Sequence, residues 1–182
     1  MKTALLLVDI QKDYFPGGKM VLEGSLEASQ KAKRVLFLFR KKNFPLVHIQ
    51  HISTRPDASF FISGTEGVEI HANVEPIANE LVVQKHYPNS FRNTPLLKHL
   101  RSKKTAHIVI AGMMTHMCID ATTRSAFDHG FQCTVLHDAC ATKALSFNSE
   151  IVPAKQVLAA FWAALSAAYA KVISTDDFIT SL

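Results

Sequence analysis

Short apolar segments alternate with longer amphipathic segments along most of the chain. The apolar segments are rich in Val, Ile and Leu, and most are apolar throughout instead of alternating with polar residues. This pattern is typical of parallel strands that are covered on both faces of a sheet. It predicts six strands, at residues 4–8, 46–50, 81–84, 108–111, 133–136 and 172–173.

The segments between these strands have helical patterns. Helices are predicted at residues 26–42, 94–101, 115–129 and 154–170, and the last begins just after Pro153. The alternation predicts an α/β fold, a doubly wound and mainly parallel sheet of about six strands with helices on both faces. Residues 53–74 form the least regular stretch, which we interpret as a long connection that shapes a pocket. We find no linker or repeat, so residues 1–182 are predicted to form a single domain.

Composition narrows the class of protein. Of the 182 residues, 48% are hydrophobic and 19% are charged, which favours a globular fold. The net charge is +5, but the Lys and Arg residues are scattered, so no nucleic-acid partner is expected. The first apolar run stops at Asp9, too early for a signal peptide, and the longest apolar stretch, 157–170, is too short to span a bilayer. Three cysteines without disulfide or metal spacing complete the expectation of a cytoplasmic protein with no membrane partner.

Reactive side chains follow several of the predicted strands. Asp9 ends the first strand, Lys85 ends the third, and Cys118 lies in the first turn of the helix after the fourth. His137 and Asp138 end the fifth. Because ligands bind at the carboxyl ends of the strands in open parallel sheets, we expect a carboxylate, an ammonium group and a thiol to converge there.

The surroundings of Cys118 predict a reactive thiol. Residues 110–118 are interpreted as a strand, a tight turn and a helix start in which Thr115 is the N-cap. Cys118 would then lie where backbone N–H groups have no partner within the helix. The positive helix end and a nearby lysine would lower the pKa of the thiol, and the same N–H groups could bind an oxyanion. In contrast, Cys133 and Cys140 are interpreted as core residues.

Three ordered segments carry a resemblance to a known family. Residues 6–15 (LLVDIQKDYF), 85–91 (KHYPNSF) and 112–119 (GMMTHMCI) closely resemble signatures of the isochorismatase-like cysteine hydrolases, which include nicotinamidases, carbamoylsarcosine amidases and biuret hydrolases. Residues 64–67 and 138–142 are also similar to family segments, so the resemblance covers nearly the whole chain. It implies the isochorismatase-like hydrolase fold and a catalytic triad of Asp9, Lys85 and Cys118.

The resemblance also implies a mechanism. Cys118 would attack the carbonyl of a small amide, ureide or related C–N substrate and form a thioester, with Asp9 moving the protons. A non-proline cis peptide is implied at Met113–Met114, where it would aim the Met114 N–H, together with that of Cys118, at the substrate oxygen. Substrate-binding roles are implied for Met113, Tyr14 and Phe91, although plain core packing is an equal alternative for the two aromatic residues.

One segment departs from the nicotinamidase pattern. Nicotinamidases have an Asp-x-His metal motif after the second strand, whereas this chain reads VHIQHIS at residues 47–53. His48 and His51 are three residues apart, so they would point to opposite sides of a strand. Asp57 and His71 are the remaining candidate ligands. We therefore expect no metal and no cofactor, and leave open whether His48, His51 or His71 contacts substrate.

The sequence also leaves two alternative functions open and predicts how the chain assembles. True isochorismatases cleave a vinyl ether without a thiol nucleophile, so Cys118 favours acyl chemistry, and a non-catalytic binding protein of the same fold is the second alternative. The predicted helix at 154–170 is apolar nearly all round, and with the resemblance this predicts a homo-oligomer. The partner expected in the site is a small molecule whose identity the sequence leaves open.

Overall fold

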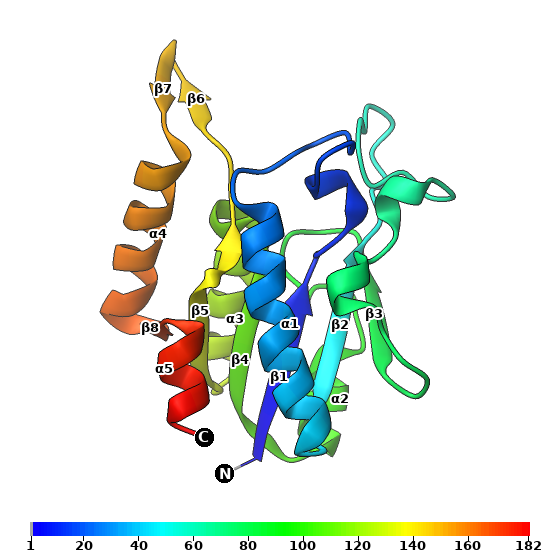
Figure 1. The fold of residues 1–182 in the computed structure, drawn as a ribbon, viewed down its shortest axis with the longest axis vertical. Helices are drawn as coiled ribbons and strands as arrows, with labels where there is room; N and C mark the ends of the chain where they lie inside the picture. The colour runs from blue at the N-terminus through cyan, green and yellow to red at the C-terminus, as the bar shows by residue number, and fades with distance from the viewer. Residues whose placement is uncertain (1) are drawn as a thin grey trace.

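A parallel six-stranded sheet forms the centre of the computed structural model, which describes residues 2–182 (Figure 1). The strand order is β3-β2-β1-β4-β5-β8, and every neighbouring pair is parallel. The strands are β1 (Lys2–Val8), β2 (Leu46–His51), β3 (Leu81–Lys85), β4 (Thr105–Met113), β5 (Gln132–Ala141) and β8 (Lys171–Ile173). The predicted doubly wound sheet is confirmed.

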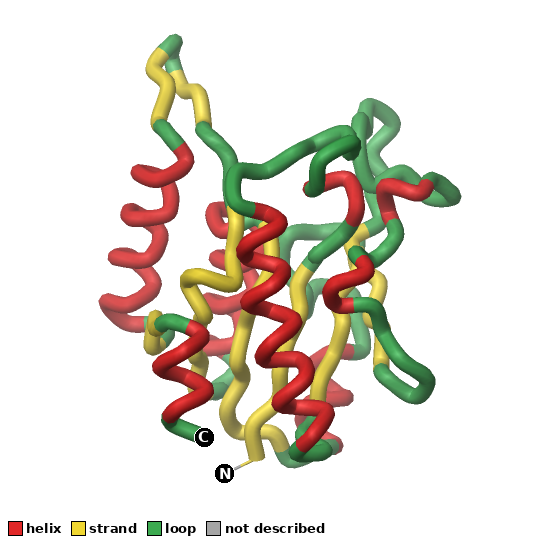
Figure 2. The backbone as a smooth tube through the Cα atoms, in the orientation of Figure 1, coloured by secondary structure: helices red, strands yellow, loops and turns green. Residues whose placement is uncertain are grey.

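Helices cover both faces of the sheet, as the alternation predicts (Figure 2). Residues of α1 (Ser25–Lys41) and α5 (Thr175–Thr180) share one hydrophobic cluster with Leu5 and Leu7 of β1. Residues of α2 (Leu96–Ser102), α3 (Asp120–Asp128) and α4 (Ala154–Ala168) share a second cluster with Ala4, Leu6 and Val8. Alternate residues of β1 therefore face opposite layers, which explains why the strand is apolar throughout.

The direction of winding reverses at the centre of the sheet. The chain runs from β1 outward to β2 and β3, and then returns to place β4 on the other side of β1. In open α/β sheets the loops that follow the two strands on either side of such a reversal run in opposite directions. The crevice between these loops is where ligands bind. The carboxyl ends of β1 and β4 are therefore the expected location of a site.

Several elements differ from the sequence prediction. The chain forms an antiparallel hairpin of β6 (Leu145–Phe147) and β7 (Glu150–Val152), which projects from the body of the molecule in Figure 1. Its Phe147 is 76% exposed, so no buried face marks these strands in the sequence. The short helix α5 was also not predicted, although Ser174 caps it by accepting a hydrogen bond from Asp177 N.

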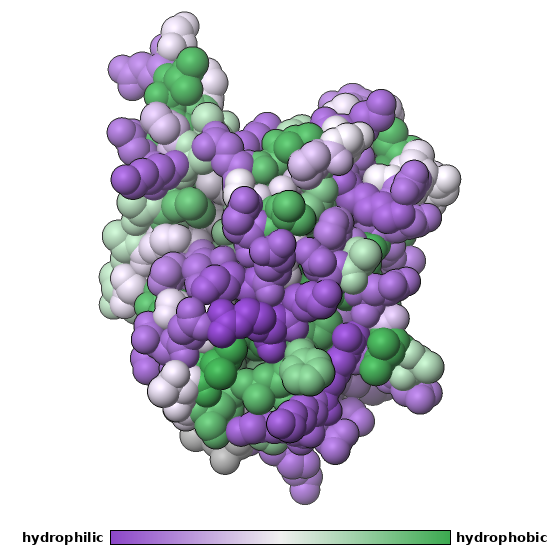
Figure 3. Space-filling view, viewed as in Figure 1, coloured by the Kyte–Doolittle hydropathy of each residue, from purple (hydrophilic) through white to green (hydrophobic). Residues whose placement is uncertain are grey.

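The outer surface agrees with the amphipathic pattern of the first helix. The face above α1 is largely hydrophilic in Figure 3, while Val35, Leu36 and Phe39 of this helix are buried against the sheet. Among residues 2–182 no helix has the combination of length and apolar character needed to cross a membrane.

Candidate active site

A buried ion pair lies at the carboxyl edge of the sheet. Asp9 directly follows β1, and Lys85 is the last residue of β3. The Lys85 Nζ atom lies 2.8 Å from Asp9 Oδ2, and both side chains are 0% exposed. Lys85 Nζ also donates to the carbonyl oxygens of Tyr87 and Pro88, each at 3.0 Å. The Asp9 carboxylate, the two carbonyl oxygens and, at 3.4 Å, His51 Nδ1 therefore surround the ammonium group and fix its position.

Asp9 has an unusual backbone conformation. Its φ is 52°, in the left-handed region that non-glycine residues rarely occupy. Two hydrogen bonds hold it there, from Asp9 N to Ile49 O and from Gln11 N to Asp9 O, both at 3.0 Å. Such conformations persist where the surrounding structure enforces them, and they are common at functional sites.

The thiol of Cys118 completes this group. Cys118 lies in a π-helical turn, Thr115–Ile119, between β4 and α3, and it is 4% exposed. Its sulfur, an Asp9 carboxylate oxygen and one imidazole nitrogen of His51 all lie within 4.8 Å of one another. The predicted convergence of Asp9, Lys85 and Cys118 is thus present in the structure.

The local structure before Cys118 differs from the prediction in its capping residue. The residue that precedes the turn is Met114, and the Thr115 hydroxyl instead donates to Ala141 O at 3.3 Å. Thr115 is therefore not the N-cap. The peptide bond between Met113 and Met114 is cis, as the family resemblance implies.

Gly112 brings this turn against the first strand. It pairs with Val8 in the sheet, and its φ is +137°. A Cβ atom at this position would overlap the Val8 carbonyl oxygen. Only glycine permits this approach, which places Asp9, the residue after β1, close to the turn that carries Cys118.

Burial controls the charges in the site. It raises the pKa of the Cys118 thiol, and the Asp9 carboxylate raises it further, while Lys85 opposes both effects. The thiol is therefore protonated at neutral pH, so the prediction of a lowered thiol pKa is wrong because burial outweighs the lysine. For Lys85, burial lowers the pKa, but the interactions with Asp9 and Cys118 outweigh it and raise the pKa above its usual range.

Two of the predicted substrate-binding residues lie on the α1 side of the site. Tyr14 is 1% exposed, and its ring centroid is 4.6 Å from that of Phe61. Burial raises the pKa of Tyr14, and interactions with Cys118 and Asp9 add to the effect. Met113 is fully buried at the end of β4 in the same hydrophobic cluster as Tyr14.

Phe91, the third predicted substrate-binding residue, belongs to the opposite layer. Its ring centroid lies 5.2 Å from that of His129 and 6.2 Å from that of Phe131. These contacts correspond to the core-packing alternative for Phe91. A role in substrate binding for this residue stays a prediction.

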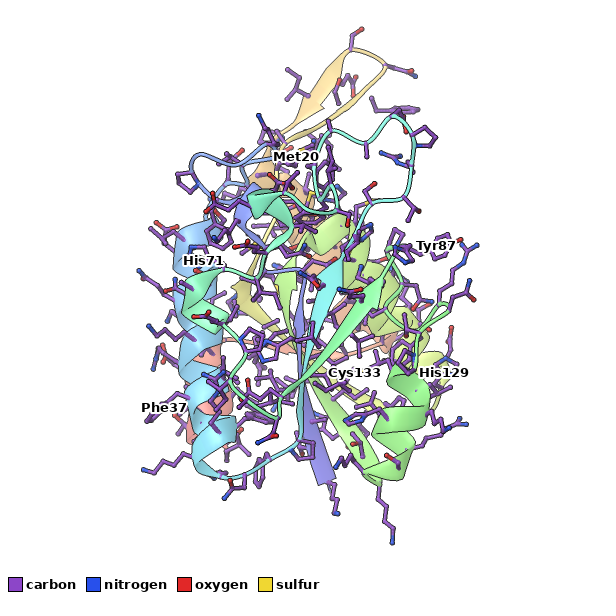
Figure 4. All side chains as sticks on the ribbon, turned by 90° about the vertical axis from the view of Figure 1, so that its right-hand side faces the viewer. Met20, Phe37, His71, Tyr87, His129 and Cys133 are labelled. Atoms are coloured by element: carbon purple, nitrogen blue, oxygen red, sulfur yellow. The ribbon has the colours of Figure 1, made fainter. Side chains whose placement is uncertain are left out.

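The structure separates the three histidines left open by the sequence. The His51 Nδ1 atom is 3.4 Å from Lys85 Nζ and 4.0 Å from Asp9 Oδ2. His48 instead contacts Glu80 Oε2 through Nε2 at 2.9 Å. His71 stacks on Phe15, with ring centroids 3.8 Å apart, and Figure 4 shows it on the α1 side of the sheet. Of these three histidines, only His51 contacts the triad. The sequence could have indicated this contact only if the register of β2 and β3, which pairs His51 with Lys85, had been known.

His137 and Asp138 do not end the fifth strand. β5 continues to Ala141, and His137 is exposed. Asp138 Oδ1 accepts hydrogen bonds from the backbone and hydroxyl of Thr175, each at 2.7 Å. Asp138 therefore anchors the start of α5, and the prediction that it belongs to the reactive edge is wrong.

The close spacing of Asp9, His51 and Cys118 would allow each to offer one ligand atom to a metal ion. However, the Lys85 ammonium group already lies 2.8 Å from Asp9, and its positive charge disfavours a divalent cation there. Asp57, another candidate metal ligand, is exposed, and its Oδ1 atom lies 3.8 Å from Arg55 Nε. The absence of a functional metal stays a prediction.

A carboxylate, an ammonium group and a thiol lie together at the carboxyl edge of a doubly wound sheet, a set of side chains suited to nucleophilic chemistry. The sequence model of the isochorismatase domain matches residues 3–177, and the chain belongs to this family. Members of the family are hydrolases, and they include amidases.

Individual relatives agree with this assignment. An isochorismatase family protein of Bacillus subtilis, YddQ, is 50% identical over 179 residues, which cover 98% of this chain and 99% of that protein. The structure of an isochorismatase hydrolase of Oleispira antarctica has a TM-score of 0.93 and 48% identity, covering 98% of this chain and 96% of that one. The nicotinamidase/pyrazinamidase of Mycobacterium tuberculosis is 27% identical over 159 residues, covering 76% of this chain and 86% of that protein.

Proposed function

We propose that this protein is a cysteine hydrolase that cleaves a small amide, ureide or related C–N substrate through a thioester on Cys118. The observation that carries the proposal is the fully buried Asp9–Lys85 pair beside a buried thiol. Two buried charges are costly unless they are paired, so their retention next to a nucleophile favours a catalytic role over a structural one. The nicotinamidase/pyrazinamidase relative, named for amide substrates, supports the C–N substrate class.

The raised pKa of the Cys118 thiol makes Asp9 the natural proton acceptor. Asp9 takes the thiol proton as Cys118 Sγ attacks the carbonyl carbon, and Lys85 stabilises the charge on the sulfur. When the tetrahedral intermediate collapses, the C–N bond breaks and the proton on Asp9 passes to the leaving nitrogen. An amine or ammonia departs, and the acyl group remains on Cys118 as a thioester.

The oxyanion of the intermediate needs hydrogen-bond donors. We assign this role to the backbone N–H groups of Met114, which precedes the turn, and of Cys118, which lies within it. Tyr14 and Met113 are proposed to contact the substrate, because both lie at the same end of the sheet. The substrate is therefore proposed to be a small molecule that enters at this edge.

A release-of-ammonia screen over small amides and ureides tests the proposal. We expect turnover with at least one compound, complete loss in Cys118→Ser, and unchanged turnover in Cys133→Ser, whose thiol lies in a strand away from the triad. Vinyl-ether hydrolysis that survives Cys118→Ser would favour the isochorismatase-type alternative. Binding without any turnover would favour a non-catalytic protein.

A further inference from the structure

His51 is held rigidly beside the triad. The buried Gln11 side chain donates from Nε2 to His51 O at 2.9 Å and accepts from His51 N at 2.7 Å. Gln11 Nε2 also donates to Val68 O at 2.8 Å, so the clamp is itself anchored. In the sheet, His51 at the end of β2 pairs with Lys85 at the end of β3. The backbone of His51 is therefore as well fixed as that of the catalytic lysine.

The environment of the ring determines its protonation. Nδ1 lies within hydrogen-bond distance of the Lys85 ammonium group at 3.4 Å, although Asp9 Oδ2 at 2.8 Å and two carbonyl oxygens at 3.0 Å lie closer to the same nitrogen. A proton on Nδ1 would face this positive charge, so the neutral ring carries its proton on Nε2 and turns a lone pair toward the triad. Burial lowers the pKa of His51 to about 4, which keeps the ring neutral at physiological pH.

The distance between His51 and Asp9 fits a shared water molecule. Their Nδ1 and Oδ2 atoms are 4.0 Å apart, which is too far for a direct hydrogen bond. A water molecule that donates to two acceptors at about 2.8 Å each separates them by roughly 4–4.5 Å. The Cys118 sulfur lies within 4.8 Å of the ligand atoms of both residues.

We propose that His51 Nδ1 and Asp9 Oδ2 together bind the water molecule that hydrolyses the Cys118 acyl intermediate. Both hydrogens of this water point at acceptors, so an oxygen lone pair faces the thioester carbon on the neighbouring sulfur. His51 is thus a catalytic residue of the second half-reaction. This inference rests on the proposed thioester mechanism.

The step balances with the groups present. The water oxygen forms a bond to the thioester carbonyl carbon while its proton passes to Asp9. Collapse of the tetrahedral intermediate breaks the C–S bond and releases the acid. The leaving sulfur recovers the proton from Asp9, which restores the resting thiol and carboxylate. His51 accepts a hydrogen bond throughout and does not change its charge.

The experiment uses p-nitrophenyl acetate as an acylating probe, so no natural substrate is needed. The burst of p-nitrophenolate measures acetylation of Cys118, and the steady state measures hydrolysis of the thioester. In His51→Leu we expect a burst rate within about twofold of the parent and hydrolysis slower by roughly 100-fold, at the low end for assisted proton transfer. Intact-mass measurement should show the acetylated protein accumulating. His51→Gln, which retains an acceptor, should hydrolyse within about tenfold of the parent.

Hydroxylamine provides a readout that a structural effect would not produce. It attacks the thioester without the bridging water, so it should release the acetyl group at the same rate from the parent and from His51→Leu. A burst that slows in parallel with hydrolysis, or hydrolysis that stays unchanged, would overturn the proposal. His51→Val serves as a strand-compatible second variant if the leucine protein does not fold.

Two control variants distinguish a failure of the role proposed for His51 from a failure of the thioester mechanism. His86→Leu alters another histidine at this edge, whose Nδ1 lies 2.8 Å from Ile52 O, and should leave both rates unchanged. Slowed hydrolysis in His86→Leu equal to that in His51→Leu would contradict a specific role for His51. If Cys118→Ala retains the burst, the thioester mechanism is wrong. If His51→Leu shows both a normal burst on Cys118 and normal hydrolysis, only the role of His51 is wrong.

Discussion

The Lys85 ammonium group and the Asp9 carboxylate lie 2.8 Å apart, and neither side chain reaches solvent. In this environment each charge depends on the other, because an isolated buried charge is strongly unfavourable. The pair is therefore both the centre of the proposed active site and a determinant of stability.

Removing one member of the pair should destabilise the fold. Lys85→Met leaves the Asp9 carboxylate buried without its cation, and we expect the free energy of unfolding to fall by about 3–5 kcal/mol. The double variant Asp9→Asn/Lys85→Met should recover part of this loss, while neither protein turns over substrate. Urea denaturation of the three proteins provides the measurement. Equal stability of the single and double variants would contradict the coupling.

Alkylation should report the opposing effects of the two charges on the Cys118 thiol. Because Asp9 raises its pKa and Lys85 lowers it, Asp9→Asn should speed labelling by iodoacetamide and Lys85→Ala should slow it. Turnover should be lost in both variants. We expect the parent to be labelled at Cys118 first, because Lys85 favours the thiolate of Cys118, whereas burial raises the pKa of Cys133 with no charged group to oppose it. Peptide mass spectrometry on partially modified protein decides this, and first labelling at Cys133 or Cys140 would refute it.

Activity should not require a metal ion. The prediction rests on the missing Asp-x-His motif and on the ammonium group that lies beside the candidate ligands. Turnover should therefore survive dialysis against a chelator without change. Loss of activity on chelation, followed by recovery with Zn²⁺ or Mn²⁺, would show that the interpretation of this site is wrong.

Glu80 should make the protein sensitive to acid. Burial alone would raise the pKa of Glu80, but hydrogen bonds from Arg40, Ile77 N and His48 outweigh it and lower the pKa to about 2. A lowered pKa stabilises the fold above the unfolded value near 4.5, and this stabilisation is lost as pH falls toward 2. Glu80→Gln should lower the free energy of unfolding by about 3 kcal/mol at pH 7 and by roughly half as much at pH 3. The exposed Asp57, changed to Asn, is the control and should show no such difference.

The outer face of α4 should bind a second copy of this chain. Within one chain only Ala154, Val157 and Leu165 of this helix are buried, although most of its other residues are apolar. An Ala-rich exposed face is typical of a helix that packs against another subunit. Light scattering at micromolar concentration should show a homo-oligomer, which Ala163→Glu dissociates and Lys155→Glu does not. A monomeric parent protein would contradict the prediction.

The hydrophobic pattern predicts the strands well because parallel strands are buried on both faces. It locates all six strands of the sheet but underestimates the lengths of β4 and β5. These two strands continue through residues that are not typical of a buried strand, such as Gly112 and Asp138. The β6–β7 hairpin has no buried face, so periodicity could not reveal it.

The sequence predicts those residues of the candidate site that directly follow a strand, because the ends of parallel strands lie at one edge of the sheet. Asp9 and Lys85 end the first and third strands of the predicted parallel sheet, and Cys118 follows the fourth, so their placement at one edge follows from the topology. The pKa of the thiol and the position of His51 depend on burial and strand register. Those quantities belong to the folded molecule and cannot be read from residue spacing.

Gly112 has no reactive group, yet it determines the clearance between the segments that carry Asp9 and Cys118. Because the peptide unit of Val8 occupies the space where a Cβ would stand, the separation of the two reacting segments is set by the size of a single hydrogen atom. Even alanine at this position would have to push β4 and its turn away from β1, and a displacement of that size at reacting atoms costs a large factor in rate. In saturation mutagenesis this chemically silent residue should therefore tolerate as few substitutions as the nucleophile.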